Sequence, residues 1–435
     1  MSAKMKYRLA RRVAQLEPSA TATMNGRVQQ MRADGVKVIS FSVGEPDFDT
    51  PTPVKNAAID AIHKNYTHYT PAGGIAELRR AVAARITVDQ GISYGINQVT
   101  VTTGAKEALY LAFQAVCDDG DEAIIPAPYW VSYVEQARLA GATPVTPRTT
   151  QANAFKLTPE QLRAAITPRT KLIVLNSPSN PTGTVYSAAE LRALADVILE
   201  TDMLVITDEI YDALSYVEYA RLLRVAPELE DRTLIVNGAA KAYAMTGWRV
   251  GYIAGPQPII TAIKDIQSHT STHTASISQY AALVAYTPNA EIEQTVRDMA
   301  GSFHKRRDLM MELLAEIPGV SCDTPDGAFY VFPDVTGLLG RPLKHGVICN
   351  SSDELNDYLL EHAQIACISG EAFGYPGHIR LSYATAEAEI VEGMGRFRDA
   401  LVGRQGDRET GRQGDRETGR PGDRETGRRG DRVTG

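Results

Sequence analysis

Residues 237–251, which read NGAAKAYAMTGWRVG, place a lone lysine among small residues. Lys241 closely follows an apolar, strand-like run, so we expect its amine to be partly desolvated. Desolvation lowers the pKa of a lysine and leaves a neutral amine that can bond covalently to a carbonyl group. Arg249 follows in the same stretch and can serve the same pocket. The alternative is a lysine at the start of a helix whose ammonium group reaches into water.

Polar residues also follow two other predicted strands. Asp208 ends the run LVITD, where a carboxylate could hold a protonated heterocyclic nitrogen while Tyr211 points into the same cavity. The alternative role of Asp208 is to cap the following helix. Asn180 lies in the loop NSPSNPTG and could either donate a hydrogen bond to a ligand oxygen or fix a proline turn.

Three further motifs carry groups suited to a flat, charged ligand. The turn TTGAKEAL could present the backbone N–H groups of Gly104, Ala105 and Lys106 to a phosphate. Trp130, in PYWVSY, could stack on a flat ring or belong to the core. Arg380, in the strand-like segment HIRLSYAT, suits a two-pronged clamp on a carboxylate, and a surface ion pair is the alternative.

Several classes of function are disfavoured. The dipeptide Gly-Lys and the pattern GxGxxG are both absent, which argues against the common nucleotide-binding loops. The formal net charge of −7 gives no basic field for nucleic acid or an anionic membrane, and no apolar run approaches the length of a membrane helix. The four cysteines are widely spaced without a CxxC pair and fit reduced thiols and a cytoplasmic location. No metal site is expected.

The order of predicted elements indicates an α/β fold. Apolar strand patterns at residues 99–103, 122–126, 171–175, 204–207 and 234–236 alternate with helical spacing, which is typical of a mostly parallel sheet between helices. Ligands of such sheets gather beyond the carboxyl ends of the strands, where Lys241 lies. A helical stretch at 299–314 could bridge to a smaller α+β domain, which the N-terminal segment completes. The spacing of Leu9, Val13 and Leu16 predicts an early helix, with a transit peptide as the alternative.

The last residues, 403–435, repeat the octapeptide GRQGDRET with small variations. Glycine and alternating charge cannot form a core, so we expect disorder. The alternative is an RNA-binding arm, but nearly balanced charges argue against it.

Seven motifs together resemble the class I pyridoxal-phosphate aminotransferases of fold type I, in the bacterial aspartate aminotransferase branch. They occur in family order: GEPDFDTP, YTPAGG, YWVSY, NSPSNPTG, DEIY, GAAKAYAMTGWRVGY and RLSYAT. The resemblance covers residues 8–402. It implies a seven-stranded, mostly parallel sheet in a large domain (46–300), a small domain (301–402) joined by residues 1–45, and a tail outside the family.

The resemblance implies pyridoxal 5'-phosphate as the cofactor and a role for each matching residue. Lys241 would hold the cofactor covalently and move the substrate proton, and Asp208 would keep the pyridine nitrogen protonated. Tyr211 and Asn180 would hydrogen-bond the ring's phenolic oxygen while Trp130 stacks on the ring. The residues implied in phosphate binding are Arg249, Gly104, Ala105, Lys106 and, from a partner subunit, Tyr69.

The substrate side follows from the same resemblance. Arg380, helped by Asn180 and the backbone of Gly44, would bind the α-carboxylate, and Lys106 would bind the distal carboxylate. The segment THTAS, which contains His273, departs from the family pattern. The resemblance therefore does not predict which residues form the partner-side wall of the pocket.

The resemblance implies a homodimer that transfers the amino group of aspartate to 2-oxoglutarate, with prephenate as a further acceptor. Aromatic amino acids, alanine or kynurenine are the alternative substrates. A non-catalytic regulator of the same fold would need an added DNA-binding region or a lost lysine, and the sequence shows neither.

Overall fold

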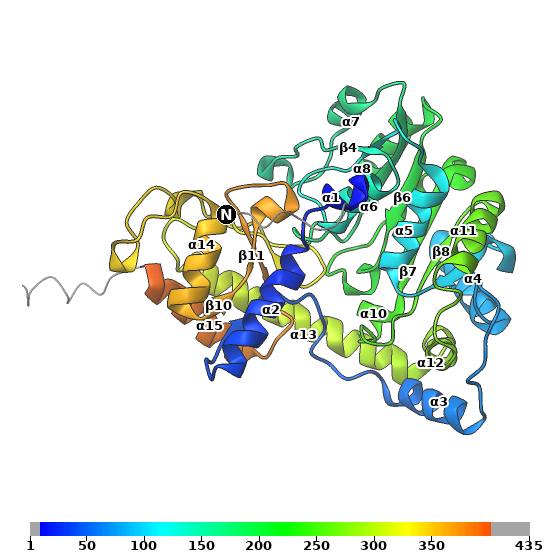
Figure 1. Ribbon diagram of the computed structural model, residues 1–435, viewed down its shortest axis with the longest axis horizontal. Helices are drawn as coiled ribbons and strands as arrows, with labels where there is room; N and C mark the ends of the chain where they lie inside the picture. The colour runs from blue at the N-terminus through cyan, green and yellow to red at the C-terminus, as the bar shows by residue number, and fades with distance from the viewer. Residues whose placement is uncertain (1–8, 402–435) are drawn as a thin grey trace, which may run out of the picture.

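A seven-stranded sheet forms the centre of the computed structural model, which describes residues 9–401 (Figure 1). Along the sheet the strands are β2 (Val99–Thr102), β8 (Gly251–Ala254), β7 (Thr233–Gly238), β6 (Leu204–Asp208), β5 (Thr170–Asn176), β3 (Glu122–Ile124) and β4 (Thr143–Val145). Strand β8 runs antiparallel to β2 and β7, and the other neighbours are parallel. The predicted fold class is confirmed.

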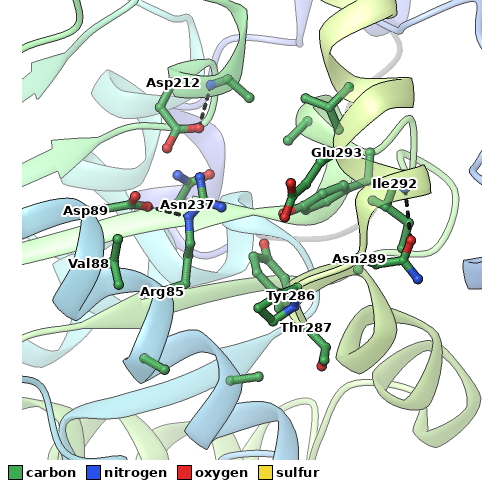
Figure 2. Close-up of a pocket in the computed structure, with 18 of the residues that line it drawn as sticks. Arg85, Val88, Asp89, Asp212, Asn237, Tyr286, Thr287, Asn289, Ile292 and Glu293 are labelled. Atoms are coloured by element: carbon green, nitrogen blue, oxygen red, sulfur yellow. Dashed lines mark hydrogen bonds and ion pairs between the residues drawn. The ribbon is translucent and has the colours of Figure 1, made fainter.

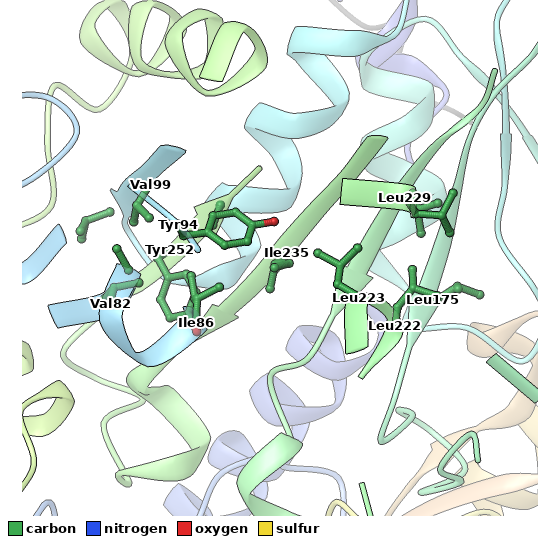
Figure 3. Packing of buried hydrophobic residues seen from close by; sticks show 14 of the residues in the cluster. Val82, Ile86, Tyr94, Val99, Leu175, Leu222, Leu223, Leu229, Ile235 and Tyr252 are labelled. Atoms are coloured by element: carbon green, nitrogen blue, oxygen red, sulfur yellow. The ribbon is translucent and has the colours of Figure 1, made fainter. Parts of the chain in front are cut away.

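Alternate residues of each strand face opposite layers of helices. In β5, Leu172 and Val174 belong to one buried cluster, whereas Ile173 and Leu175 belong to another. The first cluster is covered by α5 (Ala105–Val116), α6 (Ser132–Leu139) and α11 (Gln257–His269). The second is covered by α4 (Ala76–Gln90), α8 (Ala188–Leu199), α9 (Leu222–Val225) and α12 (Ser276–Tyr286), and Figure 3 shows part of its packing. Because both faces are buried, the strands read as continuous apolar runs.

The carboxyl ends of the central strands meet at one edge of the sheet. The register pairs Asn176 of β5 with Asp208 of β6, and Asp208 with Val236 of β7. Helix α10 (Ala239–Ala242) begins directly after β7 and carries Lys241. The backbone thereby brings the loops after β5, β6 and β7 together, as expected for a ligand site in an α/β sheet.

A second group of elements has its own core. Strands β11 (Ile368–Ser369), β12 (Ile379–Ser382) and β9 (Tyr330–Val331) form an antiparallel sheet, beside α14 (Ser352–Tyr358) and α15 (Glu387–Leu401). N-terminal strand β1 (Ile39–Ser40) pairs in parallel with β10 (Ile365–Ala366), so the N-terminal segment lies against this part of the chain. Helix α2 (Ala20–Ala33) lies against it (Figure 1). The long helix α13 (Ala290–Ala315) runs between the two parts of the chain (Figure 1).

The N-terminal helix prediction is only partly right. Helix α1 (Arg11–Ala14) is one turn long and has no buried residue, and Leu9 and Val13 are about half exposed. Its few apolar side chains have no core to pack against, so the first helix of more than one turn is α2. The predicted tail at 403–435 lies outside the described residues. Within residues 9–401, no helix has the length and apolar character needed to cross a bilayer.

Candidate functional site

A pocket of about 420 Å³ lies at the carboxyl edge of the large sheet. It is lined by every residue that we singled out from the sequence except Gly104, Tyr69 and His273. Those lining residues are Gly44, Ala105, Lys106, Trp130, Asn180, Asp208, Tyr211, Lys241, Arg249 and Arg380. Because they come from loops after five strands and from the second group of elements, only the folded chain assembles them.

Lys241 projects from the short helix α10 into this pocket, where its ammonium group donates a hydrogen bond to the carbonyl oxygen of Gly44. Burial lowers the pKa of Lys241 to about 8, although the carboxylate of Glu45 opposes the shift. The direction of this shift is the one expected from the sequence. A lysine with such a pKa has a substantial neutral fraction near physiological pH, which is the nucleophilic form. The ammonium group points into the pocket and not into bulk water.

Asp208 ends β6 as a buried carboxylate. Its Oδ2 accepts a hydrogen bond from the Tyr133 hydroxyl at 2.7 Å, and its Oδ1 accepts one from the N–H of Ile210 at 3.2 Å. Burial raises the pKa of Asp208 to about 6, and the two hydrogen bonds oppose this rise. Its contacts are with the turn directly after its own strand and with Tyr133, and not with the first N–H groups of a helix. The helix-capping alternative is therefore not what the structure shows. The carboxylate is available to hold a cation in the pocket.

Arg380 lies on β12 and is 2 % exposed, which rules out the surface ion pair. Its Nη1 donates to Oδ1 of Asn180 at 2.9 Å, and its Nη2 donates to the carbonyl oxygen of Ser42 at 2.7 Å. Its Nε has no hydrogen-bond partner among the described residues. A buried guanidinium held by neutral oxygens keeps its positive charge uncompensated, which favours an anionic ligand.

Asn180 connects this arginine to the turn after β5. Its backbone N–H donates to Oδ1 of Asn176 at 2.8 Å, and Asn176 in turn donates to the carbonyl oxygen of Asp208 at 3.0 Å. Asn180 therefore stabilises the turn through its backbone and faces the pocket through its side chain, so its two predicted roles are compatible. Within residues 9–401 the amide NH2 group of Asn180 makes no hydrogen bond, so it remains a donor on the pocket side.

Positive charge collects at the other end of the pocket, where α5 begins. Arg249 contacts the Gly104 turn, and a Cβ added to Gly104 would lie 2.5 Å from its Nη2. Lys106 has a lowered pKa because of burial and the nearby Arg249 charge, and its Nζ lies 5.0 Å from the centre of the Trp130 ring. The first N–H groups of α5 have no acceptor within the helix. Two cationic side chains beside free backbone N–H groups are an arrangement that suits a multiply charged anion.

The expected phosphate role of Gly104 needs one correction. Its own N–H donates to the carbonyl oxygen of Thr102 at 2.8 Å and is turned away from the pocket. The donors that remain at this turn are the N–H groups of Ala105 and Lys106. Gly104 instead provides a φ of 80° and room for Arg249.

Tyr69 is not brought to the pocket by its own chain. It is 89 % exposed and packs edge to face against His273, with ring centres 5.5 Å apart. The side chains of Ile59 and Ile62, on α3 (Thr52–His63), are about half exposed on the same part of the chain. Exposed aromatic and apolar side chains of this kind are typical of a protein interface.

Sequence reasoning missed several residues of the pocket. Ser19, Thr21 and Asn25, at the start of α2, line it, but their spacing reads only as a capped helix. Tyr133 follows Trp130 by three residues, a helical spacing that could have indicated its direction. Tyr330 lies in the apolar run AFYVF and gave no signal beyond a buried strand.

Comparison with known proteins agrees with this geometry. The family described as aminotransferase class I and II matches residues 36–397. The chain belongs to this family. Aspartate aminotransferase from Geobacillus stearothermophilus is 45% identical, over 90% of this chain and 99% of the relative. Aspartate/prephenate aminotransferase from Cereibacter sphaeroides is 44% identical, over 89% and 96%. The solved aspartate aminotransferase from Thermus thermophilus with maleate superposes with a TM-score of 0.86 at 41% identity, over 91% of this chain and 100% of that one.

This aminotransferase chain has a second, larger cavity of about 680 Å³, lined in part by residues of α4, α12 and α13 (Figure 2). Its charged side chains already have protein partners: Arg85 binds Asp89 at 2.7 Å, and Asp212 accepts a hydrogen bond from the N–H of Ala213 at 2.7 Å. Glu293 faces the cavity from α13 (Figure 2). The predicted chemistry-bearing residues do not line this cavity, so its size alone does not make it the reactive site.

Proposed function

We propose that this enzyme transfers the amino group of aspartate to 2-oxoglutarate and uses pyridoxal 5'-phosphate as its cofactor. The observation that carries the proposal is that Lys241, Asp208 and Arg380 line one pocket. The names of the relatives support it. Prephenate is the second acceptor in this proposal, because three relatives carry that substrate in their names. Aromatic amino acids, alanine or kynurenine are the alternative substrates for the same fold.

The residues present fit the cofactor. Pyridoxal phosphate joins a phosphate, a pyridine ring and an aldehyde, and each has a counterpart here. The phosphate would lie against Arg249 and the start of α5, the ring nitrogen would meet Asp208, and the aldehyde would bond covalently to Lys241. Trp130 lies at the side of the pocket where its ring can stack. When bound, the cofactor supplies a ring that accepts electrons from the substrate Cα.

The protein groups around the ring have separate tasks. The Asp208 carboxylate keeps a proton on the ring nitrogen by electrostatic attraction in a site that excludes water. The Tyr211 hydroxyl and the Asn180 amide would donate hydrogen bonds to the phenolic oxygen of the bound cofactor. The Lys241 amine would accept the proton of the substrate Cα and donate it again within the pocket. A pKa of about 8 suits this two-way transfer.

The substrate is held by its charges. Arg380 binds the α-carboxylate through its two-pronged guanidinium, which the carbonyl oxygen of Ser42 holds in place by accepting a hydrogen bond from Nη2. Lys106, which is beside Trp130 at the pocket wall, binds the distal carboxylate. A substrate with two carboxylates therefore engages both positive groups, whereas alanine engages only Arg380.

The same proposal includes a homodimer in the cytoplasm. The exposed Tyr69 of one subunit would reach the phosphate site of the other, with His273 beside it and the apolar residues of α3 in the interface. Light scattering is expected to give a dimer for the wild type and a monomer for Ile62→Glu. We also propose the division into residues 46–300 for the cofactor and residues 301–402 with 1–45 for the smaller unit.

The experiment is a comparison of amino donors. Cofactor-loaded enzyme is mixed with aspartate, glutamate, phenylalanine, alanine or kynurenine, and the loss of cofactor absorbance is followed in a single half-reaction. Aspartate and glutamate are expected to react with the highest kcat/KM. If alanine or an aromatic donor reacts faster than aspartate, the proposed amino donor is wrong. If the protein takes up no pyridoxal phosphate, the whole proposal is wrong.

A further inference from the structure

Tyr330, on β9, lies directly behind Tyr211 and is 1 % exposed. The two hydroxyl oxygens are 2.8 Å apart, so they share one hydrogen bond. The rings meet edge to face with centres 5.7 Å apart. Since each hydroxyl can donate only one proton, the direction of this hydrogen bond depends on what else Tyr211 contacts.

The ring of Tyr330 also supports Arg380. The guanidinium carbon lies 4.5 Å from the centre of the Tyr330 ring and 5.1 Å from that of Phe373. A planar guanidinium held by two aromatic rings loses little freedom when it binds a carboxylate. Tyr330 therefore contacts the cofactor side of the pocket through its hydroxyl and the substrate side through its ring.

The backbone of Gly44 also packs against the Tyr330 hydroxyl. A Cβ added to Gly44 would lie 2.1 Å from the Tyr330 hydroxyl oxygen, so the backbone approaches the phenol as closely as a glycine allows. The carbonyl oxygen of the same glycine accepts the hydrogen bond from Lys241. The position of the Tyr330 hydroxyl is therefore determined by the packing and is not a free rotamer choice.

We infer that Tyr330 is a positioning residue that orients the Tyr211 hydroxyl toward the cofactor and holds Arg380 for the substrate. When Tyr211 donates its proton to the phenolic oxygen of the cofactor, its own oxygen is left to accept the proton of Tyr330. A donated hydrogen bond polarises the acceptor hydroxyl and makes it a stronger donor. This inference rests on the proposed function, because it needs a ring oxygen in front of Tyr211.

The experiment separates the hydroxyl from the ring. Tyr330→Phe removes the hydroxyl, Tyr330→Leu removes both, and Tyr383→Phe is the matched control, since Tyr383 is a fully buried tyrosine that does not line the pocket. Each protein is loaded with pyridoxal phosphate. The pH dependence of its visible absorbance and its dissociation constant for maleate, a dicarboxylate without an amino group, are then measured.

A weaker Tyr211 donor leaves more negative charge on the ring oxygen, which holds the proton on the nearby nitrogen of Lys241 more tightly. Tyr330→Phe is therefore expected to raise the midpoint of the absorbance titration by about 0.5–1 pH unit, with an unchanged maleate constant. Tyr330→Leu is also expected to raise the dissociation constant for maleate by about tenfold, because Arg380 loses the ring on which it stacks. The charged groups that act on Lys241, which are Glu45, Arg380, Arg249 and Lys106, remain in every variant, so the shift in Tyr330→Phe reports the hydroxyl.

A double variant provides the strictest comparison. In a Tyr211→Phe background, Tyr330→Phe is expected to add no further shift, because its hydroxyl acts through Tyr211. A shift that persists in that background, or a Tyr330→Phe protein that titrates like the wild type, would overturn the inference while leaving the proposed function intact. A wild type that binds no pyridoxal phosphate would contradict the proposed function instead.

Discussion

The hydroxyl of Tyr133 donates a 2.7 Å hydrogen bond to the buried carboxylate of Asp208. Burial raises the pKa of Asp208 to about 6, and this hydrogen bond is the larger of the two contacts that oppose the rise. Tyr133 comes from α6 and Asp208 from β6, so the bond also joins the helix layer to the ligand edge of the sheet. The charge state of Asp208 thus depends on a residue outside its own loop.

Tyr133→Phe is expected to raise the pKa of Asp208 further. The ionised carboxylate attracts the protonated ring nitrogen, so the affinity for pyridoxal phosphate falls as the pH drops through the pKa of Asp208. The variant should lose affinity at a higher pH than the wild type, with a difference of about 1 unit. Equilibrium dialysis between pH 5 and 8 measures this, and Asp208→Asn should show no such transition. Identical profiles for wild type and Tyr133→Phe would contradict the role of this hydrogen bond.

The lowered pKa of Lys241 sets the pH dependence of cofactor attachment. Below pH 8 the ammonium form predominates and cannot attack the aldehyde, whereas above pH 8 the neutral amine predominates. The rate of absorbance change after mixing apoenzyme with pyridoxal phosphate should rise about tenfold between pH 7 and pH 9 and then level off. A rate that continues to rise toward pH 10.5 would show an ordinary, water-exposed lysine.

Gly44→Ala is expected to disrupt the pocket, since the new Cβ would overlap the Tyr330 hydroxyl. Relief of the overlap requires movement of Tyr330 or of the backbone that contacts Lys241, at a cost of about 1–3 kcal/mol in the free energy of unfolding. Gly26→Ala is the matched control, because a Cβ there meets nothing within 4 Å and alanine favours the helix. Urea unfolding should therefore show opposite signs for the two variants. Equal stability of Gly44→Ala and the wild type would show that the contact is not tight.

Arg380→Lys keeps the charge but loses the two-pronged geometry and the stacking on Tyr330. The kcat/KM for aspartate is expected to fall by about 10–100-fold, because charged hydrogen bonds to the α-carboxylate are lost. Arg148→Lys serves as the control: Arg148 also stacks on an aromatic ring, at 4.2 Å from Tyr375, but does not line the pocket. Similar losses in the two variants would point to a general effect on stability.

The sequence predicted the sheet and most of the pocket for identifiable reasons. Apolar runs such as the one before Lys241 must be buried on both faces, and their polar successors then gather at one edge of a parallel sheet. The strand-like segment around Arg380 favours a carboxylate clamp and the family resemblance supports that role, but the local pattern alone does not exclude a surface ion pair. Its burial and its contact with Asn180 depend on the packing of two distant segments.

Other features were beyond the reach of sequence patterns. The N–H of Gly104 points away from the pocket because the local turn uses it, and a turn of this kind cannot be told from an open anion cradle by composition. Tyr330 looks like any buried aromatic residue of a strand until Tyr211 and Gly44 are placed beside it. Helix α1 is short because its spaced apolar residues have no partner surface, which periodicity alone does not reveal.

The central claim is that Lys241 bonds covalently to the cofactor and then moves the substrate proton. The most direct test compares visible spectra of wild type, Lys241→Ala and Lys264→Ala after addition of pyridoxal phosphate and then aspartate. Lys264 also has a lowered pKa through burial but does not line the pocket, so it is a matched lysine. We predict that the wild type and Lys264→Ala bind the cofactor and that aspartate removes its absorbance. In Lys241→Ala, aspartate is expected to leave the cofactor spectrum unchanged. Turnover by Lys241→Ala at the wild-type rate would contradict the account.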